Sequence, residues 1–274
     1  MNTDARPAST ALTLKRILRR PSVAIALYAV IVGAIVWFSY SGAQNMGYNW
    51  QWYQVPKYLY QFTDDGFQPG EILTGLWATI ILSLTSFALA TGLGLCIALL
   101  RLSGLVVGKG VAIVYLELIR NIPLLVLLYL FYYVLGPVFG FDRWTAAVLT
   151  LAVFHSALIS EIFRAGINSV APGQWEAAAS IGMSRAQAYR YIILPQSVRF
   201  MLPPLTGEVV HLIKSSAIVS VIAVAELTTI GRNIISDTYM SFEIWFTVAA
   251  VYLALTLVLS FGVSAVERRF QSDT

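Results

Sequence analysis

Charged residues are scarce in this chain: they make up 12% of its 274 residues, whereas hydrophobic residues make up 58%. The mean hydropathy of +0.72 lies far above the range of soluble domains. The composition therefore argues against a soluble enzyme or binding module and indicates a membrane protein. The formal net charge of +4 does not require a nucleic-acid partner, and we expect none.

Cysteine and histidine are equally rare. Cys96 is the only cysteine, so the chain cannot form an internal disulfide, and a lone thiol in an apolar run is expected to be a buried packing residue. The two histidines, His155 and His211, are fifty-six positions apart, so no Cys/His cluster predicts a metal site. We therefore expect neither a metal nor a cofactor in this chain.

The sequence also lacks a complete nucleotide-binding P-loop. Residues 104–110 come close to one, but this segment is one residue too short and lacks a Ser or Thr after Lys109. No Ser/His/Asp constellation is recognisable either. The chain is therefore not expected to be an enzyme that acts alone, and any ATP has to be hydrolysed by another subunit.

Long apolar runs dominate the chain instead, and a run of ~20 residues spans a bilayer core as a helix. Six runs are long enough, at about 23–40, 72–100, 119–137, 144–163, 204–230 and 244–265. Small residues that favour close helix packing in lipid recur in the second run, namely Ser83, Ser86, Gly92 and Gly94. The predicted fold is an all-α polytopic membrane protein with about six transmembrane helices.

The first apolar run allows two interpretations. Basic residues before it and the small residues Ser41-Gly42-Ala43 after it resemble a secretory signal peptide. The run from Val23 to Phe38 is longer than the usual signal core, and Trp37 and Tyr40 resemble interfacial anchors. We favour a retained membrane helix.

Cationic residues accumulate on the cytoplasmic side of membrane proteins, so their distribution predicts the orientation. With the N-terminus inside, the cytosolic segments contain Arg6, Lys15, Arg16, Arg19, Arg20, Arg101, Lys109, Arg185, Arg190, Arg199, Arg268 and Arg269. The outer loops contain only Lys57, Arg143 and Arg232. Both termini are therefore predicted to be cytoplasmic, in agreement with an even number of spans.

The predicted outer segment 43–70 is rich in aromatic and polar residues, among them Trp50, Trp52, Asp64 and Asp65. We favour an aromatic loop that lies on the membrane surface. A docking surface for an extracytoplasmic partner is the alternative.

Several ionisable residues lie at membrane depth, where charges are costly and usually paired or functional. Glu161 and Arg164 are one helical turn apart and are expected to pair. His155 is expected to be a hydrogen-bonded packing residue, with contact to a substrate pathway as the alternative. A polar stripe on the fifth run either lines the pathway or pairs with a partner subunit; it comprises Glu208, His211, Lys214, Ser215 and Ser216.

A polar segment, 168–196, separates two of the apolar runs and has strong helix signals. Pro172 is favoured in a first helical turn, and Gly182 provides a helix stop. Ser184 and Gln187 fit a capping box that opens a second helix, which Pro195 is expected to end. We predict a capped helix–turn–helix on the cytosolic side, where a docking surface for a protein explains it better than a membrane-surface connector.

This segment resembles the EAA loop of permease subunits of ATP-binding-cassette (ABC) importers, because Glu176-Ala177-Ala178 is followed by Gly182 and by Ile192-Ile193-Leu194-Pro195. Ser160–Ile167, Gly173–Ala178 and Tyr115–Leu125 are similar to the polar amino-acid branch, which includes histidine, glutamine, glutamate, arginine and opine permeases. The resemblance covers about residues 72–266.

The resemblance implies a five-helix permease core, here with an extra N-terminal helix, and a coupling helix that docks on an ATPase subunit. The residues at the coupling positions are Gly173, Gln174, Trp175, Glu176, Ala177, Ala178 and Gly182. The implied partners are two ATPase subunits carrying ATP and Mg²⁺, a second permease copy or homologue, and an extracytoplasmic solute-binding protein. The implied location is the bacterial inner membrane.

The sequence departs from the branch where the pathway is expected. Ile122 replaces the usual Thr, Gly207 stands where Asn is common, and Lys214-Ser215-Ser216 replaces Lys-Asp/Asn-Thr/Ser. The coupling motif is intact, so these departures affect the expected substrate, an amino acid or a related solute, rather than the class.

The predicted organisation is a cytosolic tail (1–22), an extra membrane helix with an outer aromatic loop (23–71), a permease domain (72–266) and a second cytosolic tail (267–274). Two other classes remain as alternatives. An ion-coupled secondary transporter would use the polar stripe but gives the segment 168–196 no role. A structural membrane anchor explains that segment but gives the polar stripe no role.

Overall fold

The computed structural model describes residues 21–63 and 66–271. The chain divides into two units, residues 1–50 and 51–274. The predicted cytosolic tail up to residue 20, with its five basic residues, lies outside the described residues, as do Asp64 and Asp65. The boundaries predicted for the four segments stay a prediction.

The first unit contains the helix α2 (Pro21–Asn45), which begins with a proline, as many helices do. Its 25 residues make a helix about 38 Å long, longer than a bilayer core of about 30 Å. None of its side chains is buried. An apolar helix exposed on every side is suited to lipid, as predicted for the first run.

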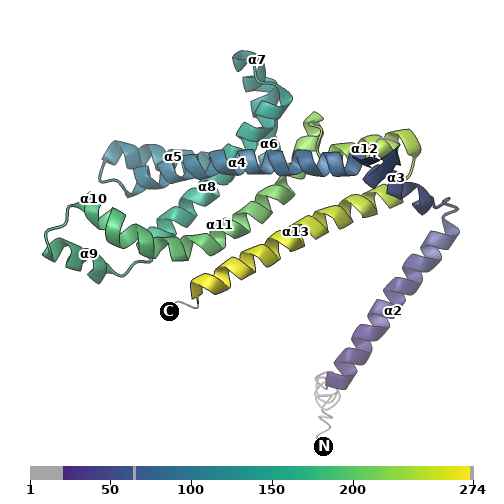
Figure 1. Cartoon of the computed structure of the whole chain (residues 1–274), viewed down its shortest axis with the longest axis horizontal. Helices are drawn as coiled ribbons and strands as arrows, with labels where there is room; N and C mark the ends of the chain where they lie inside the picture. The colour runs from purple at the N-terminus through teal and green to yellow at the C-terminus, as the bar shows by residue number, and fades with distance from the viewer. Residues whose placement is uncertain (1–20, 64–65, 272–274) are drawn as a thin grey trace, which may run out of the picture. The chain divides into compact units, whose positions relative to one another are not determined.

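The second unit contains the long helices α4 (Glu71–Leu102), α8 (Arg143–Asn168), α11 (Leu194–Ser216) and α13 (Ser241–Gln271). Shorter helical elements join them: α5 (Val106–Asn121), α6 (Leu124–Tyr129), η2 (Leu130–Leu135), α7 (Gly136–Phe139), α9 (Pro172–Ser180), α10 (Arg185–Ala188), η3 (Tyr189–Ile193), η4 (Ala217–Ile222) and α12 (Leu227–Thr238). Figure 1 shows α9 and α10 at one end of this unit and α3 (Val55–Leu59) and α12 at the other.

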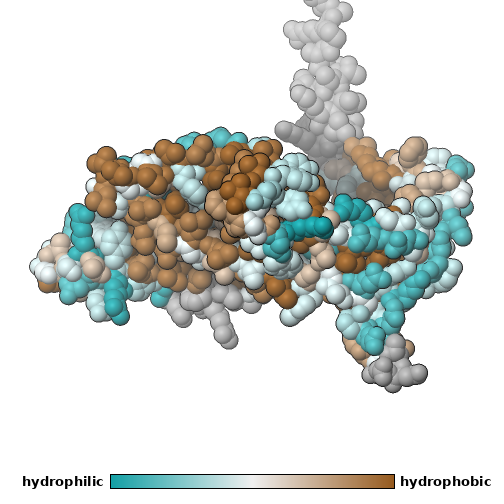
Figure 2. All heavy atoms as spheres, turned by 90° about the horizontal axis from the view of Figure 1, so that it is seen from above, coloured by the Kyte–Doolittle hydropathy of each residue, from teal (hydrophilic) through white to brown (hydrophobic). Residues whose placement is uncertain are grey.

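Five described helices are long and apolar enough to cross a membrane, or six if the bent pair α5 and α6–α7 counts as one span. This result agrees with the predicted all-helical fold of about six spans. Hydrophobic residues cover a broad area of one face, with hydrophilic residues on either side of it (Figure 2).

The aromatic segment is more ordered than a loop. After the short turn η1 (Trp52–Gln54) and α3, the antiparallel strands β1 (Tyr60–Thr63) and β2 (Gly66–Pro69) pair with Phe62 opposite Phe67. This hairpin was not predicted. Both phenylalanines are exposed, which suits an interface with lipid headgroups, although the two interpretations of the segment stay open.

The packing of α4 against α8 forms the centre of the second unit. A Cβ atom at Gly94 would lie 2.9 Å from Ile159 Cγ2 and 3.0 Å from the Ser156 carbonyl oxygen, so only glycine permits this approach. Ser83 and Ser86 are buried, as expected, whereas Gly92 faces open space. Cys96 is exposed, so its assignment as a buried packing residue is wrong. The apolar run around Cys96 has two faces, and composition alone does not separate them.

The third predicted span, 119–137, is not continuous. Between Asn121 and Leu124 the chain turns by 105°. Pro123 causes this break because the residue before a proline avoids the helical region, and Ile122 is extended with ψ 126°. The helix before the break starts as early as Val106.

The fifth predicted span, 204–230, also differs. Its helix, α11, begins earlier than predicted, at Leu194, and continues through Pro203 and Pro204. The prediction that Pro195 ends the preceding helix is wrong, because the helical path runs unbroken from Arg185 to Ile222. The π-helical turn η3 precedes Pro195, and a π turn leaves a carbonyl without its usual donor, so the missing proline N–H is tolerated there.

Beyond the fifth span, Glu226 caps α12 and does not lie in a span. Its carboxylate accepts hydrogen bonds from the backbone of Thr228 and Thr229 and from the Tyr252 hydroxyl at 3.0 Å. A cap likewise begins α8, where the Thr145 backbone amide donates to the Asp142 carboxylate. Hydrogen bonding from the Thr145 side chain, and then from its backbone, holds the pKa of Asp142 below its usual value.

We expect Gly94→Ala to destabilise the protein because the added methyl group would press on a backbone carbonyl of α8. Overpacking of this kind costs about 1–3 kcal/mol in the free energy of unfolding. Thermal unfolding in detergent measures the loss. Gly92→Ala is the matched control, since nothing lies within 4 Å of its Cβ position. Equal stability of the two variants would contradict the packing described for α4 and α8.

Candidate functional site

The segment α9–α10 is a short helix pair with defined ends. Pro172 occupies the first turn of α9, and Gly182 follows its end in the left-handed region at φ 78°. The amides of Gly182 and Met183 donate to the carbonyls of Ala179 and Ala178, which completes a Schellman motif. The predicted helix stop is therefore confirmed.

The predicted capping box at the start of α10 is also present. Ser184 Oγ accepts from the Gln187 backbone, and the Gln187 side chain accepts from the Ser184 amide at 2.8 Å. The two caps satisfy polar backbone groups at the turn without help from any other element, so the turn keeps its shape on its own.

The two faces of α9 have different environments. Trp175 is half-buried and Ala178 is buried, and the Trp175 ring packs edge-on against Tyr189 with centroids 4.8 Å apart. Both aromatic rings join a hydrophobic cluster formed around Ile167, Ile193 and Met201. Trp175 therefore packs α9 against the start of α11, although the family resemblance placed Trp175 among the coupling residues.

The opposite face of α9 is exposed. Gly173, Gln174, Glu176 and Ala177 form this face, and Gly182 is exposed at the turn. Ile181 lies beside them with 71% of its surface exposed, and the sequence reading did not select it.

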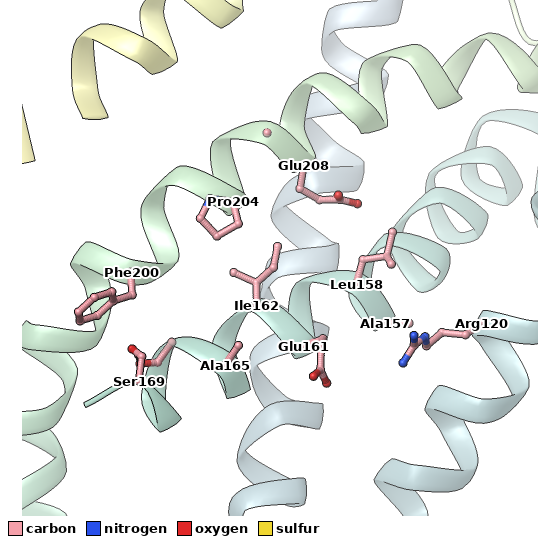
Figure 3. A pocket seen from close by; sticks show the side chains of 12 residues that line it. Arg120, Ala157, Leu158, Glu161, Ile162, Ala165, Ser169, Phe200, Pro204 and Glu208 are labelled. Atoms are coloured by element: carbon pink, nitrogen blue, oxygen red, sulfur yellow. The ribbon is translucent and has the colours of Figure 1, made fainter. Parts of the chain in front are cut away.

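A cavity of about 580 Å³ lies between α5, α8 and α11 (Figure 3). Three ionisable side chains line it, namely Arg120, Glu161 and Glu208, together with apolar residues such as Phe200 and Pro204. The volume falls within the range of small-molecule sites, and a few polar groups in an apolar wall is the usual lining.

The charges of the cavity differ in how they are paired. Glu161 binds Arg164 on its own helix, as predicted, and also Arg101 of α4 at 2.6 Å. Arg120 makes no ion pair with any residue in the described part of the chain, although it lines the same cavity. Arg120 lies in a segment that resembles the family, but the sequence did not predict it to be a pathway residue.

His155 is fully buried, and its Nδ1 lies 2.6 Å from Glu208 Oε1. It is therefore a hydrogen-bonded histidine, as expected, but its partner lines the cavity. His211 Nδ1 lies 3.7 Å from the same oxygen, and the two imidazole rings are 5.5 Å apart. The packing of α8 against α11 therefore brings together two histidines that are fifty-six positions apart in the chain, which their spacing alone did not predict. The expectation that the chain holds no metal stays a prediction.

The polar stripe of the fifth span is divided. Lys214 lines a different cavity, of about 280 Å³, next to Tyr252 and Thr256 of α13. Six residues along a helix at about 100° each give a rotation of 240°, so Lys214 lies on a different side of α11 from Glu208.

The two serines after Lys214 bond to their own helix. Ser215 donates to the His211 carbonyl and Ser216 to the Ile213 carbonyl, and Ser216 is buried. The role of Lys214, Ser215 and Ser216 in a pathway stays a prediction.

An all-helical membrane chain with a capped, exposed helix pair and a polar cavity between its spans has the architecture of a transport permease. The family model described as "Binding-protein-dependent transport system inner membrane component" matches residues 90–272, and the chain belongs to this family.

Relatives cover most of the second unit. The probable glutamine ABC transporter permease protein GlnM of Bacillus subtilis is 37% identical over 203 residues, which are 73% of this chain and 94% of that protein. The arginine transport system permease protein ArgU of Corynebacterium glutamicum is 32% identical and covers 94% of this chain and 83% of its own length. A crystal structure of an amino acid ABC transporter with histidines matches at a TM-score of 0.69 and 43% identity over 73% of this chain and 94% of that one.

These matches confirm the predicted class, a multi-pass inner-membrane permease of a binding-protein-dependent ABC importer. The family also confirms that the chain is the membrane component rather than the ATPase. Binding-protein-dependent transport implies an ATPase and a solute-binding protein as partners.

We expect Gly182→Ala to loosen the α9–α10 turn, because a side chain in the left-handed region costs roughly 1–2 kcal/mol. The amides of α9 should then exchange hydrogen with solvent roughly 5–30-fold faster, since 1.4 kcal/mol is a factor of ten. Hydrogen exchange with mass spectrometry measures this. Gly173→Ala, at a position without a positive φ and with an open Cβ site, is the control and should exchange like the parent.

Proposed function

We propose that this chain is the permease through which a polar amino acid or a related solute enters the cell by alternating access. The named substrates of the relatives, glutamine and arginine, support an amino-acid cargo. The cavity between α5, α8 and α11 supports it as well, because it combines one unpaired cation with two carboxylates in an apolar wall.

The working assembly we propose has two permease subunits, either two copies of this chain or this chain and a homologue. Two ATPase subunits carry ATP and Mg²⁺, and an extracytoplasmic binding protein delivers the solute. Both termini lie in the cytoplasm, as the distribution of basic residues predicts. The helix pair α9–α10 then faces the cytoplasm together with Arg185 and Arg190.

The observation that carries this proposal is the exposed face of α9 around Glu176. The face consists of small and polar residues, it is held by a cap at each side of the turn, and Trp175 anchors its back. A helix with a small exposed face can enter a cleft of another protein closely. Because the pair continues into α11, a movement of the ATPase subunits reaches the helix that carries Glu208.

Arg120 is suited to the carboxylate that every amino acid carries. An unpaired guanidinium binds a carboxylate through two parallel hydrogen bonds, and the surrounding apolar wall strengthens the interaction. Glu208, across the cavity, is suited to the ammonium group. The Glu161 carboxylate is already held by two arginines and has less capacity for a cation.

An ion-coupled secondary transporter remains the alternative, and the energy source separates the two classes. Vesicles containing the permease, its ATPase and the binding protein should accumulate a labelled amino acid only when ATP is enclosed with the ATPase. Accumulation driven by a sodium or proton gradient in the absence of ATP would overturn the proposal.

For the coupling role, Glu176→Lys should leave the permease inserted but abolish its co-purification with the ATPase and abolish uptake, because it reverses the charge in the middle of the docking face. Asp237→Lys is the matched control, since Asp237 is exposed on α12 at the other end of the unit. Wild-type uptake by Glu176→Lys would refute the assigned role.

For the cavity, Arg120→Gln should reduce uptake at least tenfold while the ATPase still co-purifies, because removing a charged partner of a bound carboxylate costs about 1.5–3 kcal/mol. Uptake at several substrate concentrations, with ATPase association measured on the same preparations, provides the readout. Unchanged uptake would remove Arg120 from the substrate site without affecting the coupling role of α9.

A further inference from the structure

One cluster in the membrane-spanning part contains two histidines that the transport of an amino acid does not explain. His155 of α8 and Glu208 and His211 of α11 each offer a ligand atom, and these three atoms lie within 4.8 Å of one another. The two imidazole nitrogens Nδ1 lie 2.6 and 3.7 Å from the same carboxylate oxygen of Glu208.

Burial distinguishes this cluster from acidic groups on a surface. His155 is fully buried, the Glu208 side chain is 11% exposed, and the His211 side chain is 56% exposed. Within the described residues, His155 Nε2 is buried and has no hydrogen-bond partner.

The ligand types indicate which ion would fit. Imidazole nitrogens suit Zn²⁺, Cu²⁺ and Ni²⁺, whereas Mg²⁺ and Ca²⁺ prefer a shell of oxygen atoms. Two histidines and one glutamate form a known set of zinc ligands that leaves a further position for water. Tetrahedral zinc with bonds of ~2.0–2.1 Å places its ligand atoms roughly 3.3 Å apart.

The observed separations bracket that value, so small rotations of the side chains complete the geometry. The 2.6 Å separation between His155 and Glu208 has to widen, and the 3.7 Å separation between His211 and Glu208 has to narrow. Glu208 and the exposed His211 supply these movements, because the fully buried His155 ring has the least room. The three ligands come from two helices, one from α8 and two from α11. An ion bound to all three would therefore join these helices.

We propose that His155, Glu208 and His211 form a binding site for a divalent transition-metal ion of the zinc class. The ion joins α8 to α11 beside the cavity and replaces the hydrogen bond between His155 and Glu208. This binding goes beyond the proposed function. A consequence that rests on the proposed function is inhibition: an ion that joins α8 to α11 opposes alternating access and removes Glu208 from the substrate.

The binding test uses the full chain in detergent with an affinity tag that contains no histidine. Cys96→Ser serves as the background, because Cys96 is exposed and its thiol would compete for the metal. Titration with Co²⁺, followed by its visible absorption, and displacement by Zn²⁺ should show one ion per chain. Mg²⁺ should not displace the cobalt. The Zn K-edge absorption spectrum should show nitrogen and oxygen ligands only.

Two variants test the ligands. His211→Ala removes an exposed ring, and Glu208→Gln keeps the side-chain volume, so a folded protein is expected from both. Each should weaken binding by at least the 10–100-fold that loss of a group merely supporting a ligand costs. Asp237→Asn is the control, because it removes a carboxylate at an exposed position away from the cluster and should bind like the parent.

Unchanged affinity in both ligand variants would overturn the site, as would a dissociation constant for Zn²⁺ weaker than about 1 mM in the parent. If one variant does not fold, the other decides. Inhibition of ATP-driven uptake by Zn²⁺ in the parent, lost in His211→Ala, tests the consequence. Metal binding without any ATP-driven uptake would contradict the proposed function and leave the metal site unaffected. ATP-driven uptake without metal binding would contradict the metal site and leave the proposed function unaffected.

Discussion

The fit of α8 against α4 is the interaction on which the other features depend. At Gly94 the two backbones come so close that a single methyl group has no room. This contact fixes the rotation of α8, which then presents Glu161 to Arg101 of the same helix α4 and His155 to Glu208 of α11. In a bilayer, where burial of apolar surface does not drive helices together, such close contact is the main source of order.

The sequence predicted features that depend on neighbours in the chain. The number and class of the helices follow from apolar runs, and the caps at Gly182 and Ser184 follow from short-range hydrogen bonds that any helix end requires. The pair Glu161–Arg164 is equally local. The helix pair α9–α10 could therefore be described before its surroundings were known.

The features that the sequence did not predict depend on the fold as a whole. Prolines illustrate this: Pro123 ends a helix, whereas Pro203 and Pro204 lie inside one, and the difference depends on what satisfies the freed carbonyls. The separation of Lys214 from Glu208 follows from the helix period alone. The meeting of His155 with His211 depends instead on how α11 is rotated against α8. The period of a helix limits that rotation but does not fix it.

The unbroken course of the chain from Arg185 to Ile222 has a mechanical consequence. These 38 residues form one helical rod of about 57 Å, nearly twice the thickness of a bilayer core of about 30 Å. A helix of this length extends beyond the bilayer core, so its two ends move together. The rod is unbroken from Tyr189, where the Trp175 ring packs, to Glu208, so a displacement at Tyr189 is not absorbed by a loop before it reaches Glu208.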